Sequence, residues 1–465
     1  MKTKQKPETV RKTPLGIEKR FDRFGEWLDT SWAIKKAKPI FDRYPKVILT
    51  LTWIMRLIVG GTFIVSGLSK GIDPWGTFYK MSEYLSAMHI PISELGNTVL
   101  SLAFLLFSIE FIIGACLLTG CFRKATPIMA SLFMLVMLPL TLWIAIADPV
   151  ADCGCFGDFL KISNWATFIK NVFLSLAAVW LLKFNKSAGC LITPYLQWIA
   201  AVGMSSYIMT VAYIGYWQQP LVDFRPYKIG TQLIGVEEDA EFLPVFEFIY
   251  EKDGTEHVFS EDDDLPDESE GWKFVRREEK SFVKNNDSGS SAESDNPDFR
   301  IWNETGDEDV TEILSSTGDQ TILLIPDITD LSMATSWKIN RLYDISEYDG
   351  TDFFAIAAGS PEEIEEWRDL SSGQYAIYTS EDTSIKELAR GNPALVRLSG
   401  GRIVWKTALS ALNLDDNDND SMEERVISTS ILRLERNGLQ ILTGLSLILL
   451  SFLAALALIS FLRFR

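Results

Sequence analysis

The chain has 465 residues and a formal net charge of −18 at pH 7. This acidity argues against a nucleic-acid partner, because the phosphate backbone requires a basic surface. Only His89 and His257 are present, so a His-based metal site or a Ser-His triad has almost no residues to use. Hydrophobic residues make up 47% and charged residues 23% of the chain, which indicates membrane spans joined to a polar domain.

Residues 1–46 form a basic tail that lacks the apolar core and small-residue cleavage site of a signal peptide. Aromatic and aliphatic residues recur in it at roughly helical spacing among Lys and Arg. This pattern is typical of a helix on the membrane surface, and a solvated tail with scattered aromatics is the alternative. We expect the tail to stay in the cytoplasm.

Six segments are apolar for about the 20 residues that a bilayer requires. They are 47–68, 99–118, 127–147, 165–182, 195–217 and 439–462. Lys and Arg gather before the first segment and after the second, fourth and sixth, so the positive-inside rule places both termini in the cytoplasm. In a bacterial inner membrane, residues 218–438 and the loop after the third span would then be periplasmic.

Three charged residues fall within these spans. Arg56 and Glu110 lie near the middle of the first and second spans, and we predict that they pair with each other. A proton-relay role for Glu110 is the alternative to a structural pair. Lys170 in the fourth span is close enough to the cysteine side to meet an aspartate there, or to favour a thiolate.

The residues after the fifth span have the composition of a water-soluble, acidic domain. Segment 227–313 is acidic, with strand patterns at 241–251 and 272–279 and loops at 261–270 and 284–298, the second of which we expect to be disordered. Segment 314–412 alternates strand and helix patterns and ends in a hairpin around Gly400-Gly401. This order predicts a compact α/β domain.

The sharpest chemical signal is Asp152-Cys153-Gly154-Cys155-Phe156-Gly157-Asp158. The predicted topology places Cys116, Cys121 and Cys190 on the cytoplasmic side and leaves only Cys153 and Cys155 in the oxidising compartment. A disulfide across one intervening residue is strained and therefore easily exchanged, and glycine permits the tight turn. Cys153 and Cys155 are thus the candidate catalytic residues, with Gly154, Asp152, Asp158 and Lys170 in support.

Three other interpretations of this cysteine pair stay open. It could be an inert structural disulfide, two reduced cysteines packed at the membrane edge, or half of a metal site. No further cysteine on that side completes a zinc set, so we assign no metal. The residues themselves identify no cofactor.

Several motifs over residues 47–183 resemble the DoxX/MauE group of four-helix bacterial membrane proteins. They are GGTFIVSGLSK at 60–70, DPWG at 73–76, Glu110 with Gly114, LLTG at 117–120, and DCGCFGD followed by Asn164-Trp165. MauE-type proteins are implicated in maturing a disulfide-rich periplasmic dehydrogenase subunit, and DoxX-type proteins are associated with a quinone-linked oxidoreductase. The resemblance therefore implies a four-helix core and makes quinone a candidate electron acceptor. It also implies that protein thiols or disulfides are the partners.

Segment 321–406 resembles a thioredoxin-like domain, with Pro393 at the place of the cis-proline before the hairpin. The expected Cys-x-x-Cys is missing, because residues 327–333 read DITDLSM. Such a degenerate domain can still bind extended polypeptide beside the proline.

We therefore predict a membrane α-helical bundle of six spans with a DoxX/MauE-like four-helix core, followed by an α/β thioredoxin-like domain. Our first hypothesis is a thiol–disulfide oxidoreductase that exchanges disulfides with a periplasmic partner and passes the electrons into the membrane. The alternative is a non-catalytic membrane scaffold whose acidic domain recruits partners. A transporter is a third and weaker hypothesis, because the sequence shows no evident inverted repeat.

Overall fold

The computed structural model describes residues 44–90, 95–150, 152–233, 241–252, 255–260, 272–285, 299–315, 318–412 and 431–463. The chain divides into two compact units. The helical unit comprises Met1–Tyr213 and Gln440–Arg465, and the sheet unit comprises Ile214–Leu439. The predicted tail helix, the acidic loop at 261–270 and nearly all of the loop at 284–298 lie outside the described residues.

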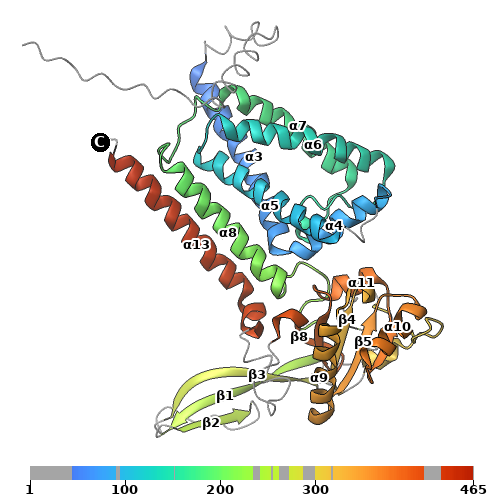
Figure 1. The fold of residues 1–465 in the computed structure, drawn as a ribbon. Coiled ribbons are helices and arrows are strands. Elements are labelled where there is room, and N and C mark those ends of the chain that lie inside the picture. The colour runs from blue at the N-terminus through green and yellow to red at the C-terminus, as the bar shows by residue number, and fades with distance from the viewer. Residues whose placement is uncertain are drawn as a thin grey trace, which may run out of the picture. The chain divides into compact units, whose positions relative to one another are not determined.

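Six helices in the described part of the chain are long and apolar enough to cross a membrane, which confirms the six predicted spans (Figure 1). Five of the helices differ from their predicted segments by at most four residues at either end, and the sixth begins at residue 431 instead of 439. The helices are α3 (Pro45–Ile72), α5 (Gly96–Thr119), α6 (Ala125–Ala147), α7 (Asn164–Phe184), α8 (Gln197–Trp217) and α13 (Ile431–Arg463).

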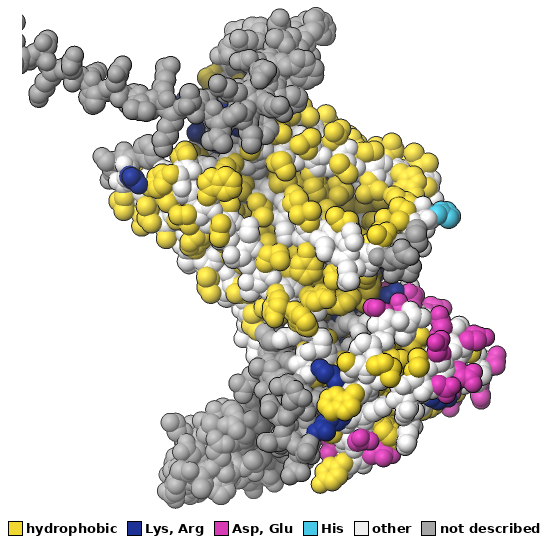
Figure 2. Space-filling model, viewed as in Figure 1, with side chains coloured by type: hydrophobic (Ala, Val, Ile, Leu, Met, Phe, Trp, Pro, Cys, Tyr) yellow, Lys and Arg dark blue, Asp and Glu magenta, His cyan; other side chains and the backbone are white. Residues whose placement is uncertain are grey.

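Helices α3, α5, α6 and α7 share one apolar core. Val59 of α3, Leu117 of α5, Ala130 of α6 and Leu181 of α7 are fully or almost fully buried within it. Large apolar side chains stay exposed on the outer faces of the helices, and Figure 2 shows them over most of the visible face of this unit. This distribution suits helices that face lipid.

Helices α8 and α13 lie side by side in the helical unit (Figure 1). The Tyr207 hydroxyl of α8 lies 2.7 Å from the Ser446 hydroxyl of α13, and the Ser460 hydroxyl of α13 lies 3.2 Å from that of Thr193, which precedes α8. Such hydrogen bonds and small residues hold membrane helices together where lipid removes the hydrophobic drive.

The contact between α3 and α5 depends on glycine. A methyl group at Gly67 would lie 2.6 Å from the backbone N of Phe111 and 2.8 Å from the carbonyl O of Phe107. Gly114 of α5 makes a similar approach, because a methyl group there would lie 2.7 Å from the Gly60 carbonyl O. The two backbones therefore approach more closely than any residue with a Cβ would allow.

The sheet unit contains two sheets. In the first, β1 (Glu241–Lys252) pairs antiparallel with both β2 (Thr255–Ser260) and β3 (Lys273–Asn285). β1 and β3 confirm the two strands that the sequence predicted there. The second sheet has five strands in the order β6-β5-β4-β7-β8, which are β4 (Asp319–Ile325), β5 (Asp352–Ala357), β6 (Ala376–Thr379), β7 (Ala394–Ser399) and β8 (Arg402–Ala408).

The five-stranded sheet is mixed, which confirms an α/β domain. Strands β4, β5 and β6 are parallel, whereas β7 pairs antiparallel with β4, and β8 pairs antiparallel with β7. Helices α9 (Met333–Asp349) and α10 (Pro361–Ser371) bury apolar side chains on one face, and α11 (Asp382–Leu388) does so on the other. The Asn392-Pro393 bond before β7 is cis, as the sequence predicted. The thioredoxin likeness itself stays a prediction.

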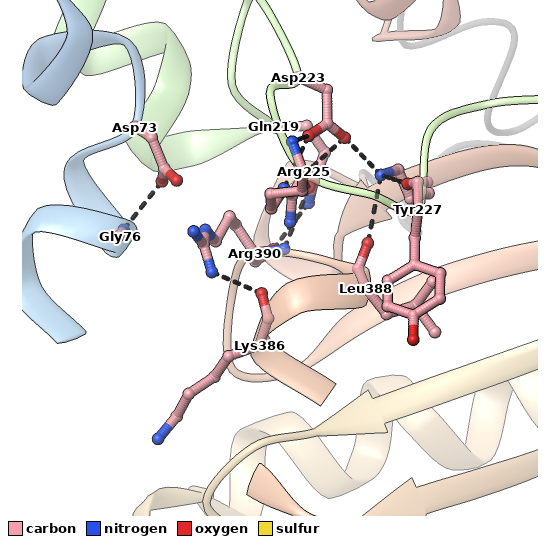
Figure 3. Close-up of polar contacts among 10 residues, drawn as sticks. Asp73, Gly76, Gln219, Asp223, Arg225, Tyr227, Lys386, Leu388 and Arg390 are labelled. Atoms are coloured by element: carbon pink, nitrogen blue, oxygen red, sulfur yellow. Dashed lines mark hydrogen bonds and ion pairs between the residues drawn. The ribbon is translucent and has the colours of Figure 1, made fainter. Parts of the chain in front are cut away.

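A buried ion network ties residues 219–227 to the five-stranded sheet (Figure 3). Lys406 of β8 is 1% exposed, and its Nζ lies 2.6 Å from an Asp223 carboxylate oxygen and 2.7 Å from the Tyr227 carbonyl O. Arg225 Nε donates to the same carboxylate at 2.8 Å. Burial by itself would raise the pKa of Asp223, but Arg225 and Lys406 overcome it and hold the pKa well below its usual range.

Replacing Gly67 by Ala should lower the free energy of unfolding of the helical unit by about 1–3 kcal/mol, because α3 and α5 must move apart. The matched control is Gly61→Ala on the same helix, where a methyl group would meet nothing within 4 Å. The measurement is the thermal unfolding midpoint of each full-length variant in detergent. Gel filtration checks that each variant is folded. Equal midpoints would contradict the close contact.

Asp223→Asn should destabilise the five-stranded sheet by about 3 kcal/mol near neutral pH, because Lys406 then stays buried without its counterion. A carboxyl group with a depressed pKa stabilises the fold above its unfolded pKa of about 3.9. The difference from wild type should therefore shrink as the pH falls below about 4. Hydrogen exchange of β8 measures it, with Asp382→Asn as a control because that carboxylate pairs with Lys386 at the surface. A difference that is independent of pH would contradict the prediction.

Candidate thiol site

The two cysteines lie in the connection between α6 and α7, which a set of local contacts holds in place. Asp148 ends α6 in the left-handed conformation, and its carboxylate accepts a 2.8 Å hydrogen bond from Asn164 at the start of α7. The Asp152 carboxylate accepts the backbone N–H of Gly154 at 2.8 Å. Gly154 and Gly157 have φ of +57° and +55°, a region that favours glycine, as the motif predicted.

Helix α4 (Pro74–Ala87) lies against this loop. The Asp73 carboxylate caps it by accepting the Gly76 N–H at 2.8 Å (Figure 3). The Tyr84 hydroxyl donates to the Cys153 carbonyl, and Lys80 Nζ lies 3.7 Å from Asp152. A methyl group at Gly154 would lie 2.8 Å from the Lys80 side chain. The residue between the two cysteines therefore has no room for a side chain.

The two thiols are free and in contact, with their Sγ atoms 3.1 Å apart. Cys153 is 8% exposed, whereas Cys155 is more accessible. The hydrogen bond from the Cys153 thiol lowers the pKa of Cys155 to about 6, against the effect of burial and with the help of Lys170 and Lys70. The same bond, together with burial, raises the pKa of Cys153. Cys155 is therefore the thiolate and Cys153 the proton donor of the pair.

A polar network lies directly beneath Cys155. Ser66 Oγ is 2.7 Å from the Cys155 carbonyl O and 2.9 Å from Glu110 Oε2, and its one proton serves one of them at a time. Lys70 Nζ lies 2.8 Å from both Glu110 carboxylate oxygens and 3.1 Å from Ser66 Oγ. Three residues of two helices thus connect the membrane interior to the thiol loop.

The predicted pairing of Arg56 with Glu110 is wrong. Arg56 is fully buried, and its guanidinium donates to the Asn185 side chain at 2.6 Å and to the Asn185 and Gly189 carbonyls, each at 2.8 Å. Glu110 pairs with Lys70, which lies about 21 Å farther along α3 at 1.5 Å per residue. The sequence assignment ended the first span at residue 68, whereas α3 continues to Ile72 and brings Lys70 inside the bundle.

Lys170 and the flanking aspartates occupy the surroundings of the pair. Lys170 Nζ lies 4.2 Å from the centre of the Phe156 ring, beside the thiols. Asp152 meets Lys80, and Asp158 lies in the short turn Gly157–Phe159. Within the described ranges, no group of three or more His, Cys, Asp and Glu side chains is arranged to hold a metal ion.

Sequence reasoning missed four residues of the site: Ser66, Lys70, Lys80 and Tyr84. A signal for two of them was present. Ser66 and Lys70 are four residues apart, which puts them on one helix face, and Gly67 between them marks a close helix contact.

The family comparison concerns the helices that build this site. The sequence model of Methylamine utilisation protein MauE matches residues 48–184. This segment is a MauE-like membrane domain. It includes α3, α4, α5, α6, α7 and the thiol loop. The match confirms a membrane protein and the expected similarity to MauE. The DoxX part stays a prediction.

A second family model, Domain of unknown function (DUF8463), matches residues 244–285. This range covers the three-stranded sheet rather than the MauE-like domain. A search of curated proteins and a search of solved structures found no match to the chain.

The alkylation rate of Cys155 should rise with pH through a midpoint near its pKa of about 6, because the thiolate is the nucleophile. Cys153→Ala should raise this midpoint, since it removes the thiol that donates to Cys155. Site-resolved mass spectrometry of iodoacetamide-treated protein measures both, with Cys190 as an internal reference. A wild-type midpoint near the ordinary value of about 8.5 would contradict the assignment.

Proposed function

We propose that the protein is a membrane thiol–disulfide oxidoreductase whose Cys153 and Cys155 exchange a disulfide with a protein partner. One observation carries the proposal: two thiols in 3.1 Å contact at the end of a membrane bundle, one of them poised as a thiolate.

The orientation of the site is part of the proposal. We infer that the thiol loop and the sheet unit lie outside the cytoplasm, in the periplasm of a bacterium, because the Lys and Arg residues at the span ends follow the positive-inside rule for that orientation. Protein disulfides persist in such a compartment. The family name suggests that the partner belongs to the apparatus for methylamine utilisation.

The sheet unit has a supporting role in this proposal. Segment 314–412 contains cis-Pro393 at the start of β7, and we infer a thioredoxin-like domain that holds a partner rather than oxidising it, because residues 327–333 contain no cysteine. Segment 227–313 adds the three-stranded sheet. The acidic surface of the α/β domain, visible in Figure 2, favours a partner with basic groups.

Three polar residues near Cys155 already have partners among themselves. Ser66, Lys70 and Glu110 bind one another and the Cys155 carbonyl. We therefore derive no step through quinone, and the transfer of electrons into the membrane stays a prediction from the resemblance. The exchange itself requires only two cysteine pairs, one in this chain and one in the partner, because the electrons that one pair loses are gained by the other.

Cys153→Ala should trap a mixed disulfide between Cys155 and an oxidised partner, because the Cys153 thiol that would attack Cys155 and displace the partner is missing. Cys155→Ala should trap far less, since Cys153 is buried and protonated. Alkylation in acid, non-reducing electrophoresis and mass spectrometry of the adduct test both variants. Cys116→Ala is the control, because this buried cysteine lies in α5 outside the thiol loop.

A double Cys153→Ser, Cys155→Ser variant separates the two hypotheses. If the protein is an oxidoreductase, client thiols outside the cytoplasm should differ in redox state between cells that carry this variant and cells that carry the wild type. Unchanged clients and full function, with loss of function when residues 227–436 are deleted, would instead support the scaffold hypothesis.

A further inference from the structure

The Lys70–Glu110 pair is an unusual feature of the MauE-like domain, because both groups are charged and almost fully removed from solvent. Their exposed fractions are 7% and 3%, and their closest atoms are 2.8 Å apart. Placing two charges in such a medium carries a desolvation penalty that the attraction between them barely offsets, and apolar residues often stabilise as well or better. The pair therefore calls for a role other than stability.

Its position indicates that role. The Ser66 hydroxyl lies within hydrogen-bond distance of both Glu110 and the Cys155 carbonyl, so the pair lies one hydroxyl group away from the backbone of the reactive cysteine. Lys70 and Glu110 also act electrostatically on Cys155, with opposite signs. A salt bridge that only joined two helices would not need to face the thiol loop.

The charged and titratable groups around the pair of thiols come from four elements. Lys70 on α3 and Lys170 on α7 favour a thiolate, and Glu110 on α5 opposes it. On α4, Tyr84 binds the Cys153 carbonyl, and Lys80 meets Asp152 of the loop and Glu83 of its own helix. With Cys155 as thiolate, the inner group of Lys70, Lys170, Glu110 and Cys155 is neutral, whereas a disulfide leaves it with one uncompensated positive charge.

We propose that Lys70, held in place by Glu110 and Ser66, stabilises the reduced form of the thiol pair and thereby makes the protein a disulfide donor. Lys70 is a positioning residue that acts through the charge of Cys155. This inference rests on the proposed exchange function and adds its direction: the oxidised pair accepts electrons from partner thiols. A disulfide whose reduced form is stabilised is a strong oxidant.

The exchange balances as follows. A partner thiol loses its proton, and the thiolate attacks Cys155 Sγ. The Cys153–Cys155 bond breaks, a mixed disulfide forms, and Cys153 leaves and takes up one proton. The second partner thiol loses its proton and attacks the partner sulfur of the mixed disulfide, which releases Cys155 as a thiolate. The partner has lost two electrons and two protons, of which Cys153 keeps one and solvent receives the other.

The test uses the full chain in detergent, equilibrated with reduced and oxidised glutathione, with the redox state of the 153/155 peptide read by mass spectrometry. Lys70→Met should lower the equilibrium constant for reduction of the disulfide about tenfold, which corresponds to roughly 30 mV. It should also raise the midpoint of Cys155 alkylation. Glu110→Gln should shift both quantities in the opposite direction, because it leaves Lys70 unopposed.

Two further variants keep the result interpretable. The double variant Lys70→Met, Glu110→Gln carries no unpaired buried charge, and its constant should lie between those of the single variants. Lys161→Gln, an exposed change in the same connection, should match wild type. Shifts of the same sign in both single variants, or none beyond the Lys161 control, overturn the inference. Since glutathione replaces the partner, this failure is distinct from unchanged clients, which would refute the exchange function.

Discussion

The contact of α3 with α5 at Gly67 is the constraint on which the thiol site depends. The two helices approach so closely that a Cβ at this position would touch the backbone of Phe111. Their approach puts Lys70 within 2.8 Å of Glu110 and lets Ser66 reach the Cys155 carbonyl. One residue without a side chain therefore connects helix packing in the membrane to the position of a reactive sulfur.

Much of the fold could be predicted because it follows from local properties of the sequence. The length of each apolar run identified all six spans, and alternating strand and helix patterns identified segment 314–412 as an α/β domain. The Cys-x-Cys pair and its tight turn could also be predicted, since a turn with positive φ favours glycine at those positions.

The pairing of charges could not be predicted, because it depends on contacts between segments far apart in the chain. The first span was predicted to end at residue 68, whereas α3 ends four residues later at Ile72. The added residues include Lys70, which is the partner of Glu110. The sequence analysis assigned no partner to Lys406, yet Lys406 is buried against Asp223, far away in the sequence. Hydrophobic periodicity predicts neither the Lys70–Glu110 pair nor the Lys406–Asp223 pair, because it indicates which faces are apolar and buried and not which residue a charge contacts.

The crowding around Gly154 has a consequence for how this chemistry is encoded. Positive φ and the Lys80 side chain together disfavour any other residue between the cysteines, so this position offers no substitution that could adjust the sulfurs. Their environment is supplied by α3, α4, α5 and α7. Transplanting the heptapeptide into another membrane protein would carry over the contact between the two thiols and leave behind the charges of Lys70, Lys170 and Glu110 that act on it.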